Sequence, residues 1–232
     1  AEIHDQQMAD GQAAIERYQA VLAHDDTNSV ALEAVDRLFE AAQRFEDLRD
    51  VLERKVLLAQ PDSRVAVQYR LAYLLESNFS DVEGAFEHYR AILAQEPGHG
   101  QSVEALERLM AFESHRAEIV EALEPLYIEA GQWAKLVTAL QLRRELLDDP
   151  FDTAALCVRI AEIQELELED ASGAFDSYAD ALKSGVSDGD VLARIEELAE
   201  TANRWQDACV LLDQIASKID DDFERRGMLA KL

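Results

Sequence analysis

Residues 80–94 read SDVEGAFEHYRAILA, and related stretches occur at residues 9–23, ADGQAAIERYQAVLA, and at residues 169–183, EDASGAFDSYADALK. An ungapped alignment superposes an alanine, a tyrosine and a leucine in every copy: Ala14, Tyr18 and Leu22; Ala85, Tyr89 and Leu93; Ala174, Tyr178 and Leu182. A spacing of four residues places these side chains on one face of an α-helix. The sequence therefore predicts one helix that is repeated three times, each copy N-capped by an aspartate, Asp10, Asp81 or Asp170.

A second set of matching stretches lies between these copies. They read LFEAAQRFEDL at 38–48, LYIEAGQWAKL at 126–136 and LAETANRWQDA at 198–208. Each is expected to end one helix, to turn, and to begin another helix with an aromatic residue. The expected turns lie near Gln43, Gly131 and Asn203, and the aromatic residues expected to pack between helices are Phe45, Trp133 and Trp205.

The composition predicts a protein built of helices. The chain has 232 residues, of which 48% are hydrophobic, and only four prolines and nine glycines interrupt it. Helix-forming residues dominate, and no run of β-branched residues favours a strand. The predicted helices are 1–8, 10–24, 29–43, 45–59, 63–77, 81–95, 101–113, 116–130, 133–147, 152–167, 171–184, 189–202, 204–219 and 222–232.

The chain is strongly acidic, with a formal net charge of −26. Such a surface repels nucleic-acid backbones and anionic membranes, so binding to either is not expected. The charge is compatible with a basic partner, although a surface that serves solubility alone is the simpler explanation. The sequence has no apolar run long enough for membrane insertion and no signal-peptide pattern, and we take the cytoplasm as the default location.

Motifs for catalysis or metal binding are not evident. There is no glycine-rich phosphate loop, GxSxG or HExxH motif, and the five histidines are scattered. The two cysteines, Cys157 and Cys209, are interpreted as reduced core residues because both lie in apolar helical segments. We therefore expect neither a metal ion nor a cofactor, and no enzymatic activity.

The repeat resembles the tetratricopeptide family. The first two copies lie 71 residues apart, close to twice the family's period of about 34 residues. The family's second-helix motif matches Ala85, Tyr89, Ile92 and Pro97. The resemblance implies an all-α solenoid of antiparallel helical hairpins that forms a right-handed superhelix. The expected units are roughly 1–71, 72–160 and 161–232, with an extra helix near 114–130, in a segment cut from a longer array.

The resemblance also implies a concave groove lined by the first helix of each hairpin. The residues that it places there are Tyr69, Tyr73, Glu76, Val158, Glu162 and Glu165. Tyrosines beside carboxylates would suit a basic or amphipathic segment, although packing of Tyr69 and Tyr73 against the next hairpin is an equal alternative. The family's clamp for a C-terminal carboxylate uses Lys, Arg and Asn at these positions, so that kind of ligand is not expected.

The sequence therefore favours a non-catalytic scaffold that binds a protein or peptide segment. The alternatives are a structural spacer or self-association segment of a larger protein and, more remotely, an all-helical enzyme. The sequence specifies neither the partner nor the oligomeric state.

Overall fold

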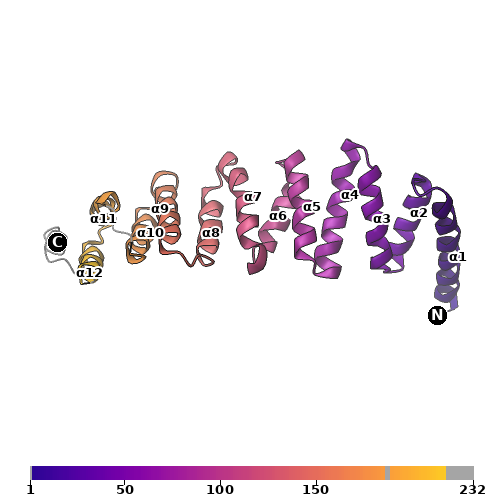
Figure 1. Ribbon diagram of the computed structural model, residues 1–232, viewed down its shortest axis with the longest axis horizontal. Coiled ribbons are helices and arrows are strands. Elements are labelled where there is room, and N and C mark those ends of the chain that lie inside the picture. The colour runs from indigo at the N-terminus through magenta and orange to yellow at the C-terminus, as the bar shows by residue number, and fades with distance from the viewer. Residues whose placement is uncertain (1, 186–188, 218–232) are drawn as a thin grey trace. The chain divides into compact units, whose positions relative to one another are not determined.

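The computed structural model describes the backbone of residues 2–185 and 189–217, and the side chains of these ranges from residue 11 onward. Every regular element in these ranges is a helix, which confirms the all-α prediction. The chain divides into two compact units, Ala1–His115 and Arg116–Leu232. Within each unit, helices that follow one another in the sequence pack side by side as antiparallel hairpins (Figure 1).

The first unit contains six α-helices. They are α1 (Glu2–His24), α2 (Ser29–Ala41), α3 (Phe45–Leu58), α4 (Pro61–Leu74), α5 (Val82–Gln95) and α6 (Gly100–Leu109). A short π-helix, η1 (Leu75–Phe79), follows α4, and a 3-10 turn, η2 (Glu113–His115), ends the unit. The predicted helix 63–77 thus changes its hydrogen-bonding pattern in its last turn, which the residue pattern did not indicate.

The second unit contains the other six α-helices of the described residues. They are α7 (Arg116–Glu129), α8 (Trp133–Arg144), α9 (Pro150–Leu166), α10 (Ala171–Lys183), α11 (Gly189–Thr201) and α12 (Trp205–Ala216). The extra helix expected near 114–130 is α7, and Pro125 lies inside it. The predicted helix 222–232 lies outside the described residues.

The repeated helix supplies the core of both units. Ala85 and Ala174 are fully buried, as is Tyr89, and Tyr178 is 4% exposed. Alanine lets the neighbouring helix approach closely, and the tyrosine ring fills the adjoining space. Burial of a large apolar side chain stabilises a fold by about 1.5–3 kcal/mol, so a recurring Ala–Tyr pair is an efficient repeated packing unit.

Two of the three predicted N-caps are confirmed. Asp81 accepts a hydrogen bond from the backbone N–H of Gly84 at 2.9 Å, and Asp170 accepts one from Gly173 at 2.9 Å. The prediction for Asp10 is wrong, because α1 runs without a break through this position. The first copy has Ala13 where the other two have glycine, so it lacks the small residue over which the capping carboxylate sits.

The predicted turns at Gln43, Gly131 and Asn203 are confirmed. All three residues have left-handed backbones, with φ of 54°, 63° and 54°. After each one, the next backbone N–H bonds to a carbonyl five residues earlier, as in a Schellman motif. Two expectations of burial are wrong, because Trp205 is 49% exposed and Cys209 is also exposed. Both lie on α12, outside its buried set of Ala208, Leu211, Leu212 and Ala216.

Candidate binding face

The predicted groove residues lie on two matched helices, α4 with η1 in the first unit and α9 in the second. Tyr69 is half-buried, with its ring 5.7 Å from that of Tyr89 and 5.5 Å from that of His99. Tyr73, one turn further along α4, is 54% exposed. Tyr69 therefore has a packing role, whereas the Tyr73 side chain is available on the surface.

Glu76 is held by other residues of the first unit. The Tyr89 hydroxyl donates a hydrogen bond to its Oε2 at 2.8 Å, and Arg108 bonds both carboxylate oxygens at 3.2 Å. Burial, reinforced by the Glu76 carboxylate, raises the pKa of Tyr89. Glu76 therefore joins η1 to α5 and α6, and this internal role accounts for its charge.

The second unit repeats this arrangement around Glu165. Arg194 of α11 forms ion pairs with Glu165 and with Glu197. Burial, followed by the Glu165 carboxylate, raises the pKa of Tyr178. Glu165 keeps one buried carboxylate oxygen, Oε2, without a hydrogen-bond partner.

A second kind of ion pair also recurs in both units. In the first, Arg70 of α4 donates to both oxygens of Asp36 on α2, at 2.8 and 2.9 Å, and Lys55 pairs with the same carboxylate. Burial acts to raise the pKa of Asp36, but the two cations outweigh it and the pKa is lowered. In the second unit, Arg159 of α9 pairs with Glu124 of α7.

These four ion pairs share one topology, in which an arginine reaches past the intervening helix. They join α2 to α4, η1 to α6, α7 to α9, and α9 to α11. We call α2, α4 and α6 the α4 face, and α7, α9 and α11 the α9 face. A bridge between alternate helices fixes the spacing of the surface that they form, because each guanidinium binds a carboxylate over a narrow range of distances. Arg108 and Arg194 were missed from the sequence because each reaches its glutamate across an intervening helix.

A hollow of about 300 Å³ lies beside α4, lined by residues of α2, α3, α4 and η1. We call it the α4 hollow; it is lined by Glu40, Phe45, Leu48, Leu52, Tyr69, Arg70, Tyr73, Leu74 and Asn78. Its walls are mainly aromatic and aliphatic. Its two charged residues, Arg70 and Glu40, pair with each other at 3.1 Å, so the lining carries no net charge.

A hollow of about 310 Å³ lies beside α9 on the α9 face. We call it the α9 hollow; it is lined by Val158, Glu162, Glu165, Leu166, Tyr178, Asp190, Val191 and Arg194. Three carboxylates face one arginine there, so the lining is acidic. The two hollows together include five of the six predicted residues, and Glu76 is the one that lines neither.

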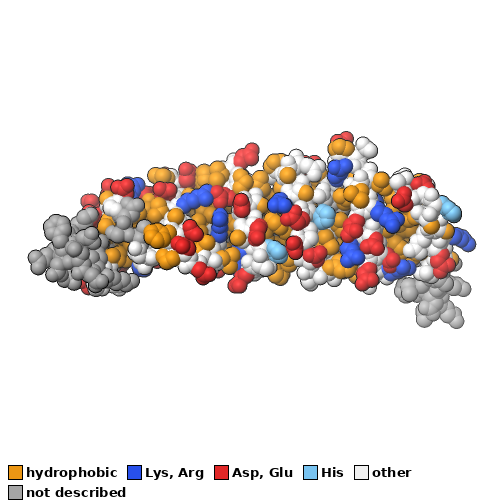
Figure 2. Space-filling model, in the orientation of Figure 1, with side chains coloured by type: hydrophobic (Ala, Val, Ile, Leu, Met, Phe, Trp, Pro, Cys, Tyr) orange, Lys and Arg blue, Asp and Glu red, His pale blue; other side chains and the backbone are white. Residues whose placement is uncertain are grey.

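The remaining surface has a mixed character. Acidic and basic side chains are interspersed over the visible face of each unit (Figure 2). Among the residues that the structure describes, no group of three His, Cys, Asp or Glu side chains could hold a metal ion. No described helix combines the length and apolar composition needed to cross a membrane.

Comparisons with known proteins give similarities of structure only, since no family model and no curated protein matches the sequence. The TPR2AB domain of yeast Sti1, solved as an Hsp90 complex, is 15% identical with a TM-score of 0.36, covering 99% of this chain and 98% of that chain. A tetratricopeptide repeat protein from Parabacteroides merdae is 13% identical with a TM-score of 0.36. The match covers 99% of this chain and 94% of that chain. BtubC from P. vanneervenii is 16% identical with a TM-score of 0.33. The match covers 97% of this chain and 92% of that chain. At such TM-scores the fold assignment rests on the helices themselves, whose repeated motif and hairpins make the chain similar in architecture to tetratricopeptide-repeat proteins.

Proposed function

We propose that this chain is a non-catalytic scaffold that binds a protein or peptide segment on its α4 and α9 faces. The observation that carries the proposal is the pair of hollows on matched helices, each beside an exposed side chain that the fold does not use. Tyr73 is 54% exposed beside the α4 hollow. Glu162 is exposed beside the α9 hollow.

The α4 hollow suits an apolar or aromatic side chain of the partner. Phe45, Tyr69 and Tyr73 supply aromatic walls, and Arg70 is already neutralised by Asp36 and Glu40. Large aromatic residues at the centre of an interface commonly provide most of the binding energy. We infer that Tyr73 closes over an inserted apolar side chain.

The α9 hollow suits a lysine or arginine of the partner. Val158, Leu166 and Val191 offer apolar surface for the aliphatic stem of such a side chain. Arg194 is occupied by Glu165 and Glu197, which leaves the exposed Glu162 to meet the positive head group. Each hollow is therefore proposed as a contact in its own unit, the α4 hollow for an apolar side chain and the α9 hollow for a basic one.

The proposal can be tested with a defined probe, a fluorescein-labelled 12-residue peptide of alternating leucine and lysine. We expect it to bind the chain, measured by fluorescence anisotropy at 150 mM salt, and to bind more tightly than its leucine–glutamate counterpart. Glu162→Lys is expected to weaken binding of the lysine peptide about tenfold, because it replaces the exposed carboxylate of the α9 hollow by a cation. Tyr73→Ala should weaken it through loss of an apolar contact.

A matched control separates a local contact from the general attraction of an acidic protein for a basic peptide. Glu200 is an exposed glutamate on α11 that does not line the α9 hollow. Glu200→Lys changes the net charge by the same amount as Glu162→Lys. Equal weakening by the two substitutions, or equal affinity for the two peptides, would refute the proposed face.

A structural spacer is the second candidate, and the ion pairs between alternate helices favour it. Four arginine–carboxylate bridges hold the spacing of the two faces whether or not a ligand is present. If the chain is only a spacer, neither peptide should bind to it. Its far-UV circular dichroism should then be the same with and without peptide.

A further inference from the structure

The helix α12 has one covered side and one exposed side. Ala208, Leu211 and Leu212 belong to the core cluster that α12 forms with α10 and α11. Trp205 and Cys209 lie outside this cluster; Trp205 is 49% exposed, and Cys209 is also exposed. A spacing of four residues puts them on the same side of the helix, and we call them the α12 face. The exposed tryptophan leaves a large apolar surface in water, at a cost that a covering segment would remove.

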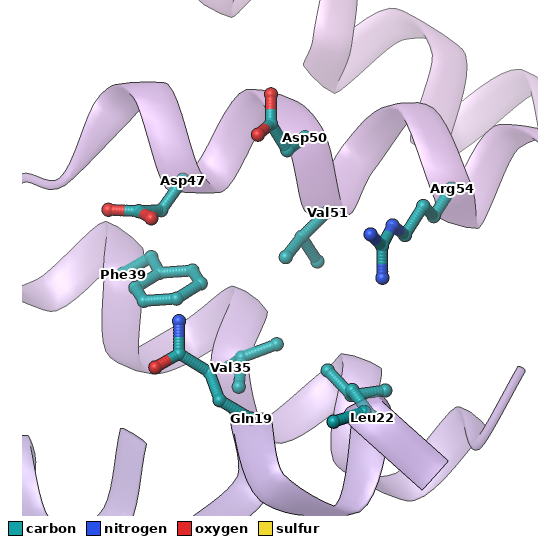
Figure 3. Close-up of a pocket in the computed structure, with 9 residues that line it drawn as sticks. Gln19, Leu22, Val35, Phe39, Asp47, Asp50, Val51 and Arg54 are labelled. Carbon is teal, nitrogen blue, oxygen red and sulfur yellow. The ribbon is translucent and has the colours of Figure 1, made fainter. Parts of the chain in front are cut away.

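The matched helix α3 is covered on both sides by its neighbours. Val51 points toward Phe39 of the preceding helix, α2 (Figure 3). Phe45, at the repeat position of Trp205, is half-buried and lines the α4 hollow together with residues of the following helix, α4. Arg49, at the position of Cys209, lies over the ring of Phe79 in η1, 5.2 Å from its centroid. In the first unit, the segment that follows α3 therefore covers this face.

The helix α8 shows the same coverage in the second unit. Trp133 and Val137 occupy the positions of Trp205 and Cys209. Trp133 is half-buried and Val137 is 7% exposed, and α8 packs against the following helix, α9. Among the described residues, α12 is followed by no further helix. The α12 face is therefore the position at which a following helix would pack.

Residues 222–232 have the apolar pattern of that following helix. Leu229 and Ala230 match Leu71 and Ala72 of α4 in the repeat. Leu71 and Ala72 are both fully buried. The same two positions of α9 are also buried, by Ile160 and Ala161. The segment lies outside the described residues, so its sequence identifies it as the occupant.

We propose that residues 222–232 dock as a helix on the α12 face, in the way that α4 packs on α3 and α9 packs on α8. Leu229 and Ala230 lie against α12 and shield Trp205 and Cys209 from solvent. This contact is an interface within one chain, and it does not depend on the peptide-binding faces proposed above.

The short tether favours this occupant over a second copy of the chain. The aromatic residue and the buried alanine are separated by 27 residues in the first copy, by 28 in the second and by 25 in the third. A tether of this length holds the segment near its site at an effective concentration in the millimolar range. A second copy would have to displace a segment that is already present.

Thiol labelling with Ellman's reagent tests the proposal, because Cys209 is the exposed cysteine and Cys157 is buried. With the segment docked, Cys209 should react slowly. Leu229→Ser should raise its rate about tenfold or more, because burial of the leucine favours docking by at least that factor. Lys231→Ser is the matched control and should leave the rate unchanged, since Lys231 takes the position of the exposed Tyr73.

Undocking and unfolding give different results in this assay. Undocking exposes Cys209 alone, so one thiol per chain reacts, whereas unfolding of the second unit also exposes Cys157 and gives two. Fluorescence supplies a second readout, because Trp133 is the one tryptophan left after Trp205→Phe. In that background, Leu229→Ser should leave the emission of Trp133 unchanged.

A second variant keeps the test decisive if Leu229→Ser unfolds the unit. Leu232 takes the position of Leu74, which is 5% exposed at the end of α4, so Leu232→Ser should also release Cys209 alone. The proposal is overturned if neither variant makes Cys209 react faster than it does in Lys231→Ser. It is also overturned if the rate falls as the protein concentration rises, because a second copy would then cover the α12 face.

Discussion

The α4 and α9 helices derive from the same repeat position, yet they present different surfaces. Their buried residues correspond, since Ala72 and Ala161 are both fully buried. Their solvent-facing residues differ, because Tyr73 of α4 occupies the position of Glu162 in α9. The repeat thus conserves the packing of the helix while it changes what the helix offers to a partner, one hollow being aromatic and neutral and the other acidic.

The largest difference in stability between the units is expected at the carboxylates that pair with Arg70 and Arg159. Asp36 has a side chain only 3% exposed and neutralises both Lys55 and Arg70, whereas Glu124 is 18% exposed and pairs with Arg159. Asp36→Ala leaves the mostly buried Lys55 without its carboxylate and should cost about 3–5 kcal/mol. Glu124→Ala should cost about 1 kcal/mol, as is usual for a more exposed pair.

Urea unfolding measures this difference with two signals. Both tryptophans, Trp133 and Trp205, belong to the second unit, so their fluorescence reports that unit, while far-UV circular dichroism reports both. Asp36→Ala should cause an early loss of ellipticity that precedes the change in fluorescence. Equal destabilisation by Asp36→Ala and Glu124→Ala would contradict the proposed difference in burial.

The next largest difference in stability is expected when alanine replaces the glycines that lie beside the capping aspartates. A Cβ at Gly84 would lie 2.6 Å from Asp81 Oδ2, while one at Gly173 would meet Asp170 Oδ2 and also lie 2.8 Å from Gln164 Nε2. Gly84→Ala should cost about 1 kcal/mol by displacing the cap. Gly173→Ala should cost more, about 1–3 kcal/mol, because it also disturbs a buried side chain.

Thermal melting followed by circular dichroism is sufficient to compare the two glycine variants. Gly100 is a suitable control, because it begins α6 and a Cβ there would meet nothing within 4 Å. Gly100→Ala should therefore be neutral or slightly stabilising. A higher melting temperature for Gly173→Ala would show that the Asp170 cap is not held as described.

The smallest expected difference depends on pH and concerns His88 of α5, whose counterpart in α10 is Ser177. Burial lowers the pKa of His88, and the carboxylates of Glu53, Asp81 and Glu87 offset this only in part. The folded state therefore binds the proton less readily than the unfolded state, whose pKa is about 6.5. Stability is retained above that pH and is lost as the pH falls below it toward the lower folded-state pKa.

His88→Ser makes this position of α5 match that of α10. The substitution should remove the loss of folding stability at low pH. The test is the urea midpoint of the original chain and the variant at pH 7.5, 6.5 and 5.5, read by ellipticity. The original chain is expected to lose stability relative to the variant as the pH falls through this range. Parallel pH profiles for the two proteins would rule out a contribution from His88.

Local structure was largely predictable from the sequence because it depends on residues close together in the chain. The predicted helices 29–43, 45–59 and 81–95 agree with α2, α3 and α5 to within two residues. The turns at Gln43, Gly131 and Asn203 were predictable because the neighbouring apolar pattern recurs without gaps. The error at Asp10 had a visible signal, since Ala13 replaces the glycine that the other copies place under the cap.

The candidate site was only partly predictable, because its chemistry depends on helices that are not adjacent in the sequence. Tyr73 and Glu162 were identified from their repeat positions. The partners of Glu76 and Glu165 were not, since Arg108 and Arg194 each reach them across an intervening helix. No periodicity within one helix indicates that a carboxylate is already neutralised from two helices away. The exposure of Trp205 likewise depends on the packing around α12 rather than on the repeat motif.

The bridges between alternate helices have a consequence for how each unit loses its structure. In a stack held only by contacts between neighbours, a terminal hairpin can open while the rest stays folded. An arginine that reaches past one helix ties three consecutive helices into one cooperative segment. Opening of α6, for example, breaks the Arg108 contact and thereby loosens η1 as well as α5. Fraying at the ends of each unit is therefore penalised, and amide hydrogens of α4 and α6 should exchange with solvent together rather than one helix at a time.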